Sequence, residues 1–113
     1  MIQPVTADRV FYALSHALRR EVVERLAAGP ATVSQLAAPY DMKLPSFIQH
    51  LAVLEQSHLV RSRKEGRVRT YELVPEPFQA AEDWLSARRQ AWEARLDRFD
   101  QHVLRLKAQE TEP

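Results

Sequence analysis

Apolar residues recur at spacings of three and four along the first quarter of the chain, the pattern of amphipathic helices. A first short helix is predicted after Thr6, whose hydroxyl can cap the exposed amides of the first turn. A second helix is predicted after Ser15, its expected cap, and Gly29-Pro30 ends it. The apolar positions that define these two helices are Val10, Phe11, Leu14, Leu18, Val22, Val23 and Leu26.

Two further helices are predicted close together. Thr32-Val33-Ser34-Gln35 has the form of a capping box, in which the hydroxyl and the amide side chain satisfy each other's exposed backbone donors. After the link Asp41 to Leu44, Pro45 suits the first turn of a fourth helix that runs to about Ser57. Two short helices joined by a tight link have the layout of a helix-turn-helix. The polar positions that the second of them exposes are Ser46, Gln49 and His50.

A hairpin is predicted directly after the fourth helix. Residues 60–64 and 67–73 are rich in β-branched and long side chains, and they flank Glu65-Gly66, a pair able to form a tight turn. A hairpin in this place is the wing of a winged helix.

From Pro77 onward the helical pattern returns and continues for about seven turns. Its apolar positions are Phe78, Ala81, Leu85, Trp92, Leu96, Phe99, Val103 and Leu106. Such a stripe extends beyond a core of this size and would stay exposed in a monomer, and large exposed apolar patches mark interfaces. The predicted fold class is therefore mainly α with a small β-hairpin, a winged helix-turn-helix followed by a long C-terminal dimerisation helix.

A length of 113 residues suits one domain, so we expect a single winged-helix domain over residues 1–113, with its core at 5–74 and the dimerisation helix at 75–109. The composition, 45% apolar and 27% charged, allows a buried core with a solvated surface. The absence of cysteine excludes disulfides and thiolate metal sites. The start of the chain lacks a signal-peptide pattern and no run is long and apolar enough to span a membrane, so we expect a cytoplasmic protein.

The net charge of +1 is informative only through its distribution. Residues 43–71 contain six basic and two acidic residues, which leaves +4 on the helix-turn-helix and wing. After Pro75, eight acidic residues face six basic ones, so the last helix is close to neutral. The two regions are therefore expected to have different partners.

Four ordered segments between about Val10 and Leu73 resemble the ArsR family of bacterial winged-helix repressors. The segments are Ser15 with Arg19-Arg20-Glu21-Val22, then Thr32 to Ala37, then Gln49 to Glu55, then Leu59-Val60 with Arg63, Gly66, Arg67 and Tyr71. The resemblance implies a symmetric dimer paired through its first and last helices. It also implies binding to promoter DNA near its own operon, and release when an inducer binds.

Site residues are predicted on this basis. Short polar groups at the start of a recognition helix can reach base edges, and basic side chains on a wing can neutralise phosphates. The predicted DNA contacts are Lys43, Ser46, Phe47, Gln49, His50, Arg63, Lys64, Arg67 and Arg69. The predicted dimer contacts are Val10, Phe11, Leu14, Phe78, Leu85, Trp92, Leu96 and Phe99. The alternative for the helix residues is an ordinary polar face, and the alternative for the wing residues is a hairpin whose charges only prevent aggregation. The alternative for His50 is a hydrogen bond across the dimer or to backbone.

Three positions depart from the family pattern. His58 stands where the family usually has glycine at a helix end, so either His58 adopts the left-handed conformation or the turn is rebuilt. Lys43 replaces the usual capping serine ahead of the recognition helix, and Ile48 occupies a position often held by a serine that faces DNA. Base preference therefore cannot be copied from relatives.

The sensor also departs from the family pattern. Many relatives bind metals through cysteines, which this chain lacks, and Asp100 with His102 resembles only part of the carboxylate and histidine site of others. Closed metal sites need three or four ligands, so we expect no metal and no cofactor. Trp84, Trp92 and Phe99 are either the lining of an inducer pocket or simply core and dimer seam.

No catalytic residues are predicted. Nothing resembles a phosphate loop, and Ser15-His16 lack an orienting acid in a recognisable motif. The expected function is a homodimeric repressor of its own or a neighbouring operon, bound to double-stranded promoter DNA and released by an unknown inducer. The alternatives are a MarR-like or PadR-like regulator, and a winged-helix module that binds a protein.

Overall fold

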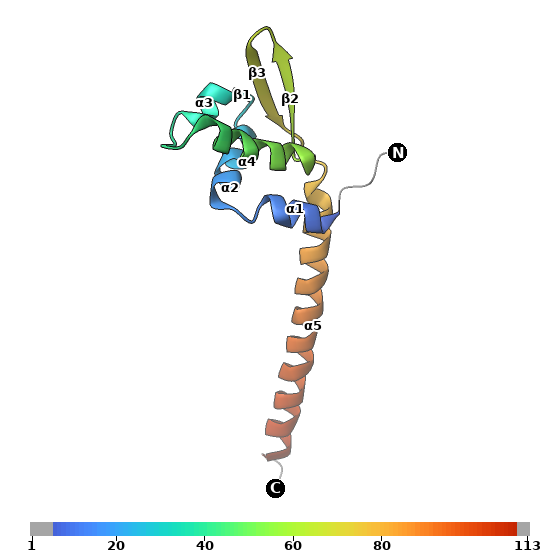
Figure 1. Cartoon of the computed structure of the whole chain (residues 1–113). Helices are drawn as coiled ribbons and strands as arrows, with labels where there is room; N and C mark the ends of the chain where they lie inside the picture. The colour runs from blue at the N-terminus through green and yellow to red at the C-terminus, as the bar shows by residue number, and fades with distance from the viewer. Residues whose placement is uncertain (1–5, 111–113) are drawn as a thin grey trace. The chain divides into compact units, whose positions relative to one another are not determined.

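Short helices and a three-stranded antiparallel sheet alternate through the first 73 residues, and one long helix follows (Figure 1). The computed structural model describes residues 6–110, so Val5, the expected first residue of the core, lies outside it. The elements are α1 (Ala7–Ala13), α2 (Ala17–Ala27), β1 (Ala31–Thr32), α3 (Val33–Ala37), α4 (Leu44–Gln56), β2 (Val60–Glu65), β3 (Val68–Leu73) and α5 (Phe78–Glu110). The predicted fold class, a winged helix-turn-helix followed by a long helix, is confirmed.

Two of the three predicted capping residues, Thr6 and Thr32, are confirmed. Thr6 Oγ1 accepts a hydrogen bond from the backbone amide of Arg9 at 3.4 Å. The capping box of α3 is complete, with Gln35 N 3.2 Å from Thr32 Oγ1 and Thr32 N 2.9 Å from Gln35 Oε1. The predicted cap of α2 is wrong, because the N-cap residue is His16, and Ser15 Oγ instead donates to the Tyr12 carbonyl at 2.6 Å.

His16 caps α2 instead. Its Nδ1 accepts from the backbone amide of Leu18 at 3.1 Å, and its extended backbone makes it the last residue before the helix. A histidine cap lies outside the usual preference for Ser, Thr, Asp and Asn, which is why the sequence pattern favoured the neighbouring serine.

The end of α4 resolves the choice left open at His58. His58 adopts the left-handed conformation with φ of 60°. The amide of Leu59 donates to the Leu54 carbonyl at 3.1 Å and that of His58 to the Glu55 carbonyl at 3.0 Å. These two bonds are those of a Schellman motif, which satisfies the last carbonyls of the helix. The turn keeps the geometry for which glycine is the usual residue.

The hairpin turn lies one residue later than predicted. Glu65 pairs with Val68, so Gly66-Arg67 forms the turn and Glu65 belongs to β2. Gly66 has φ of 62°, and no residue but His58 and the two glycines has a positive φ in the described chain. A two-residue loop with positive φ at its first position only is the type II′ turn, which requires glycine there. Arg67 is thereby placed at the tip of the wing.

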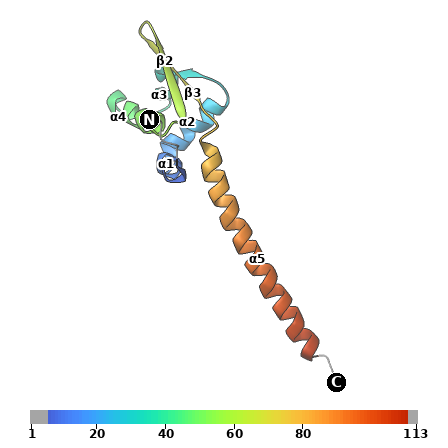
Figure 2. The ribbon, with the colours of Figure 1, turned by 90° about the vertical axis from the view of Figure 1, so that its right-hand side faces the viewer.

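A short strand that the pattern did not predict completes the sheet. β1 pairs antiparallel with β3 through Ala31 and Tyr71 and through Thr32 and Thr70, which gives the strand order β1-β3-β2. Two residues are too few to show the alternation by which strands are recognised. Both ribbon views show the β2–β3 end of the sheet projecting beyond the helices (Figures 1 and 2).

The core is enclosed by α1, α2, α3, α4 and the base of the wing. Its largest fully buried side chains are Phe47, Leu36, Leu51, Leu54, Leu59, Val10, Val22 and Val60. Val10 therefore has no surface to offer a partner, and the prediction that it makes a dimer contact is wrong. Phe11 and Leu14 are half-buried and pack on the same core.

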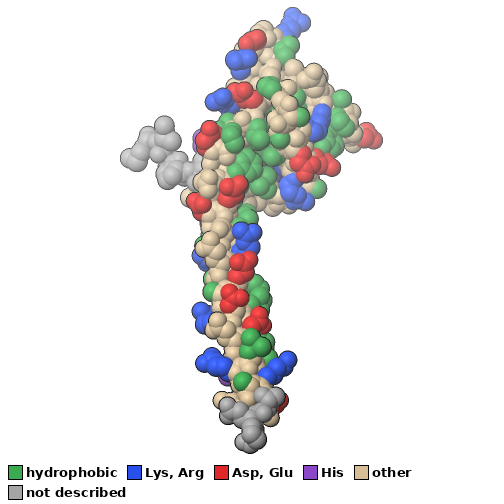
Figure 3. Space-filling view, turned by 180° about the vertical axis from the view of Figure 1, so that it is seen from behind, with side chains coloured by type: hydrophobic (Ala, Val, Ile, Leu, Met, Phe, Trp, Pro, Cys, Tyr) green, Lys and Arg blue, Asp and Glu red, His purple; other side chains and the backbone are tan. Residues whose placement is uncertain are grey.

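The chain divides into two compact units between residues 81 and 82. The first turn of α5 belongs to the first unit, because Ala81 is buried in its core and Phe78 packs against it. The second unit is the rest of α5, in which no described residue is buried. Figure 3 shows apolar side chains recurring among charged ones along this helix. The exposed apolar residues are Trp84, Leu85, Trp92, Leu96, Phe99, Leu104 and Leu106.

Replacing His58 with glycine should stabilise the fold. The left-handed conformation costs a residue with Cβ about 1–2 kcal/mol, and glycine gives back roughly half of this through its freer unfolded chain. We expect His58→Gly to raise the free energy of unfolding by about 0.5–1 kcal/mol, measured by urea unfolding at one protein concentration. His58→Ala, which keeps Cβ, is the control and should give no gain. A glycine variant no more stable than the alanine variant would contradict the strain at this position.

Candidate nucleic-acid interface

Three of the predicted contact residues are exposed on the outward face of α4 or immediately before it. Ser46 and Gln49 are exposed on the helix, and Lys43 is exposed immediately before it. Lys43 is the N-cap position and makes no side-chain cap, so its ammonium group is not used by the helix start. Leu44 and Ile48, which were not predicted as contacts, are exposed beside them.

Phe47 cannot belong to this face. It is fully buried, and its ring stacks on that of Tyr40 with centroids 5.6 Å apart. Phe47, Leu51 and Leu54 follow one another by four and three residues and form the inner face of α4. The prediction that Phe47 contacts DNA is therefore wrong, and the spacing of these apolar residues was the signal that could have excluded it.

His50 points into the fold, toward α2. Its Nδ1 lies 3.1 Å from Nη1 of Arg19, and its ring lies 4.5 Å from that of His16. Because a guanidinium group can only donate, Nδ1 of His50 must accept. This hydrogen bond joins α4 to α2, so His50 is less available to DNA than the exposed Ser46 and Gln49. The partner of His50 is a side chain of its own subunit, whereas the alternatives from sequence were a bond across the dimer and a bond to backbone.

Arg19 joins α4 to the end of α1. Arg19 is buried, with only 7% of its surface exposed. Nε donates to the Ala13 carbonyl at 2.7 Å, and Nη2 lies 3.2 Å from the Tyr12 carbonyl and 3.3 Å from Ser15 Oγ. The guanidinium also lies over the Tyr12 ring, 5.5 Å from its centre. With His50 as its remaining partner, Arg19 joins the middle of α4 to α1 and α2.

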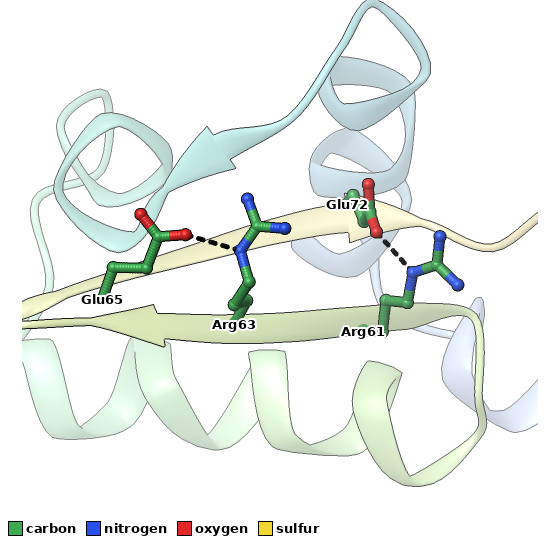
Figure 4. A network of polar contacts seen from close by, with 4 residues as sticks. All are labelled: Arg61, Arg63, Glu65 and Glu72. Carbon is green, nitrogen blue, oxygen red and sulfur yellow. Dashed lines mark hydrogen bonds and ion pairs between the residues drawn. The ribbon is translucent and has the colours of Figure 1, made fainter.

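The outer face of the wing carries two ion pairs. Arg63 Nε lies 2.9 Å from Glu65 Oε1 on the same strand, and Arg61 pairs with Glu72 across the hairpin (Figure 4). The Arg63 and Glu65 side chains are 76% and 74% exposed. Pairs this exposed contribute only about 0–1 kcal/mol. Arg63 can therefore exchange Glu65 for a phosphate at little cost.

The other face of the wing connects to α4. Arg69 donates to Ser62 Oγ at 2.7 Å, and Ser62 in turn donates to Glu55 Oε1 of α4 at 2.7 Å. Burial raises the pKa of the neighbouring Tyr71 hydroxyl, and the Glu55 carboxylate raises it further. This chain of polar groups fixes the base of the wing against the recognition helix.

The side chains of two basic residues near the tip have no hydrogen bond or ion pair with any residue that the structure describes. They are Lys64, which lies directly opposite Arg69 in the ladder, and Arg67, which lies in the turn. Like charges opposite each other on a sheet repel. An anion bound beside them relieves this repulsion, so the tip of the wing favours a polyanionic partner.

A hollow of about 350 Å³ separates the wing tip from the starts of α3 and α4. Its lining combines basic, hydroxyl and aliphatic side chains: Thr32, Val33, Ser34, Leu44, Arg67, Val68 and Arg69. The hollow therefore places the start of α4, through Leu44, beside two predicted contacts of the wing, Arg67 and Arg69. Sequence reasoning missed its aliphatic part, because Leu44 and Val68 lie on different elements.

The candidate sensor residues lie in the second unit. Trp92 and Phe99 line a shallow open hollow of about 340 Å³ with Arg95 and Leu96, whereas Trp84 is not part of it. No group of three or more histidine, aspartate or glutamate side chains within residues 6–110 could hold a metal ion. Over the same residues, no helix combines the length and apolar character that a membrane span requires.

A helix-turn-helix, a wing behind its second helix and a basic surface over both define a winged helix-turn-helix of the nucleic-acid-binding class. A family model described as a helix-turn-helix domain matches residues 14–63. The crystal structure of the ArsR family transcriptional regulator RHA00566 is similar with 49% identity and a TM-score of 0.75, covering 82% of this chain and 97% of that one. The chain belongs to the ArsR family of transcriptional regulators, as the sequence pattern predicted.

Curated relatives agree with this assignment. The HTH-type transcriptional regulator Rv2034 of Mycobacterium tuberculosis is 44% identical over 68 residues, which are 60% of this chain and 64% of that protein. The transcriptional repressor SdpR of Bacillus subtilis is 27% identical over 78 residues, 69% of this chain and 87% of that one. The chain thus spans just under two thirds of the length of Rv2034. The MarR-like or PadR-like alternative has no support among these relatives.

The cluster around His50 makes stability depend on pH. Burial lowers the pKa of His50 from its ordinary value, and the charges of His16 and Arg19 lower it further. The folded state therefore binds fewer protons than the unfolded chain between the lowered pKa and about 6.5. This contribution to stability is fully present above about pH 6.5 and is lost as the pH falls through the pKa of the folded state.

We expect the melting temperature to fall between pH 7.5 and pH 5.5, and His50→Gln, which keeps a neutral acceptor, to reduce that fall. His102→Gln, at an exposed position of α5, is the control and should retain the full pH dependence. Calorimetry over the pH series measures all three proteins. If His50→Gln and the wild type lose stability in parallel, the titration of His50 is not the cause.

Proposed function

We propose that this chain is a homodimeric, DNA-binding transcriptional repressor, in which α4 enters the major groove and the wing follows the adjacent phosphates. The observation that supports the proposal most strongly is that Leu44, at the start of α4, borders one hollow with Arg67 and Arg69 of the wing, while Ser46 and Gln49 are exposed on the same helix. The helix offers hydrogen-bonding groups for base edges, and the wing offers cations without partners in the described chain. The similarity to SdpR, named a repressor, supports repression as the direction of regulation.

The apolar stripe of α5 supports the homodimer. From Trp92 onward, apolar positions alternate by four and three residues, the heptad spacing of a helix that pairs with another helix. The residues in this register are Trp92, Leu96, Phe99, Val103 and Leu106. Trp92 is 58% and Phe99 62% exposed in the single chain, so both have surface left to bury. A second copy of the chain supplies the matching stripe.

Two copies related by a twofold axis present two recognition helices. Such dimers bind half-sites that are about 34 Å apart, one turn of DNA, on a near-palindromic operator. The proposed contacts are Lys43, Ser46, Gln49, Arg63, Lys64, Arg67 and Arg69. The proposed dimer contacts are Phe11, Leu14, Phe78, Leu85, Trp92, Leu96 and Phe99.

We also propose that an inducer releases the protein from DNA, and we assign no chemical class to this inducer. The hollow at Trp92 and Phe99 is open along one helix, and the heptad spacing favours a paired helix as its occupant over a small molecule. The function needs no catalytic step. A regulator of this kind meets its promoter in the bacterial cytoplasm, where we place it.

The phosphate role is tested by reversing the charge at the tip of the wing. Binding of the wild type to its own upstream DNA should weaken steeply between about 50 and 200 mM salt. Arg67→Glu should lower the affinity at least tenfold and make the salt dependence shallower by about one unit in log Kobs against log salt. Electrophoretic mobility shift and fluorescence anisotropy measure both.

The control is Arg105→Glu, which makes the same charge change on α5. Arg105 lies nine residues, or two and a half turns, after Leu96 and therefore on the opposite side of the helix. It should bind DNA as the wild type does. An Arg67→Glu protein with wild-type affinity on an operator that the wild type selects would remove the wing from the proposal.

The dimer is tested on α5. Phe99→Glu places a charge in the middle of the apolar register, where pairing would bury it, so the variant should be monomeric at micromolar concentration. Light scattering of the wild type, Phe99→Glu and Arg105→Glu should give two, one and two subunits. Circular dichroism checks that the winged helix stays folded. A dimeric Phe99→Glu protein would show that other surfaces hold the subunits together.

A further inference from the structure

The recognition helix begins with two exposed aliphatic side chains. Leu44 is 50% and Ile48 42% exposed, and they stand four residues apart, so they lie on one side of α4. Val68 of the wing, 51% exposed, lines the same hollow as Leu44. Single exposed aliphatic residues need no explanation, but a pair on one side of this helix forms part of the surface that we assign to DNA.

The polar and charged groups around Leu44 and Ile48 argue against an apolar protein surface as the partner that covers them. Lys43 precedes it, Ser46 and Gln49 lie on the same helix, and Arg67 borders the same hollow as Leu44. A partner must therefore be polyanionic overall and yet present apolar groups between its polar ones. The major groove of DNA meets both conditions, since the C5 methyl group of thymine is its apolar feature.

The geometry points to Ile48, with Leu44 beside it, as the residue that selects thymine by packing against its 5-methyl group in each half-site. Ile48 has no hydrogen-bonding group, so it distinguishes bases by shape and burial. The inference rests on the proposed function and deepens it, because it specifies the base for which the site is selective. It also gives a physical role to the isoleucine at a position where the family pattern has serine.

Uracil in place of thymine removes only the methyl group and leaves base pairing unchanged. The operator is first obtained by selecting duplexes bound by the wild-type protein from a random pool. Each thymine of one half-site is then replaced singly by deoxyuridine, and the affinity of the wild-type dimer is measured by anisotropy. We expect one or two positions per half-site at which the substitution weakens binding about fourfold, the effect of exposing one methyl-sized group.

The variants identify the residue. Ile48→Ser should bind thymine and uracil duplexes equally at one of those positions, with its salt dependence unchanged. Ile48→Val retains a branched aliphatic surface and should keep most of the difference. Arg67→Glu should weaken both duplexes by the same factor. Because Ile48 is exposed and lies outside the core, the serine variant is expected to fold, and its melting curve checks this.

Three results would overturn the inference. If the wild-type protein selects an operator but no uracil substitution weakens binding, methyl recognition is absent while DNA binding stands. If Ile48→Ser and Leu44→Ser both keep the full difference between thymine and uracil, other residues recognise the methyl group. If the wild-type dimer selects no duplex at any salt concentration, the proposed function fails together with the inference.

Discussion

The position of the recognition helix depends on one buried cation. The Arg19 guanidinium loses most of its hydration in the fold and replaces it with two carbonyls at the end of α1, the Ser15 hydroxyl and the His50 ring. A buried charge is tolerated only when its hydrogen-bonding groups are filled. The planar fork of arginine reaches several acceptors in different directions at once, which the single ammonium of lysine cannot do. One side chain therefore ties three helices to a common geometry.

The same constraint explains why polar residues of α4 fall into two groups. His50 is directed inward by Arg19, whereas Gln49, its neighbour in sequence, is left exposed. Near the end of the helix, Glu55 accepts a hydrogen bond from Ser62 of the wing. Structural hydrogen bonds are thus concentrated at the middle and end of α4. Its first turn, by contrast, keeps its side chains exposed for contact with a partner.

Features fixed by local chemistry were predictable from sequence, and features fixed by distant contacts were not. The capping box at Thr32 involves neighbours three residues apart, and the left-handed residue at His58 follows from the end of one helix. The turn at Gly66-Arg67 was misplaced by one residue because the register of β2 with β3 decides which residue enters the loop. The exposed stripe of α5 was predictable because its period continues well beyond what one small core can cover.

The errors at the candidate site have a related cause. A residue can lie in a contact motif and still point inward, since consecutive positions of a helix differ by about 100° in direction. Phe47 and Val10 were placed by their segment rather than by their side of the helix. His50 required knowledge of Arg19, 31 residues earlier in the chain, and no pattern within α4 contains that information. The exposed Leu44 and Ile48 became visible for the same reason, once the inner side of α4 was known.

The exposed stripe of α5 also bears on how long a subunit survives. A helix whose side chains from residue 82 to 110 are nowhere buried gains little from tertiary packing, and unpacked helices open readily. Cellular proteases cleave such open segments. With the pairing through α5 proposed above, an assembled subunit would be protected along this helix, whereas an unpaired one would be exposed along it. Assembly would then set the turnover of the protein, so that unpaired chains are removed and the regulator persists mainly as the form that binds its promoter.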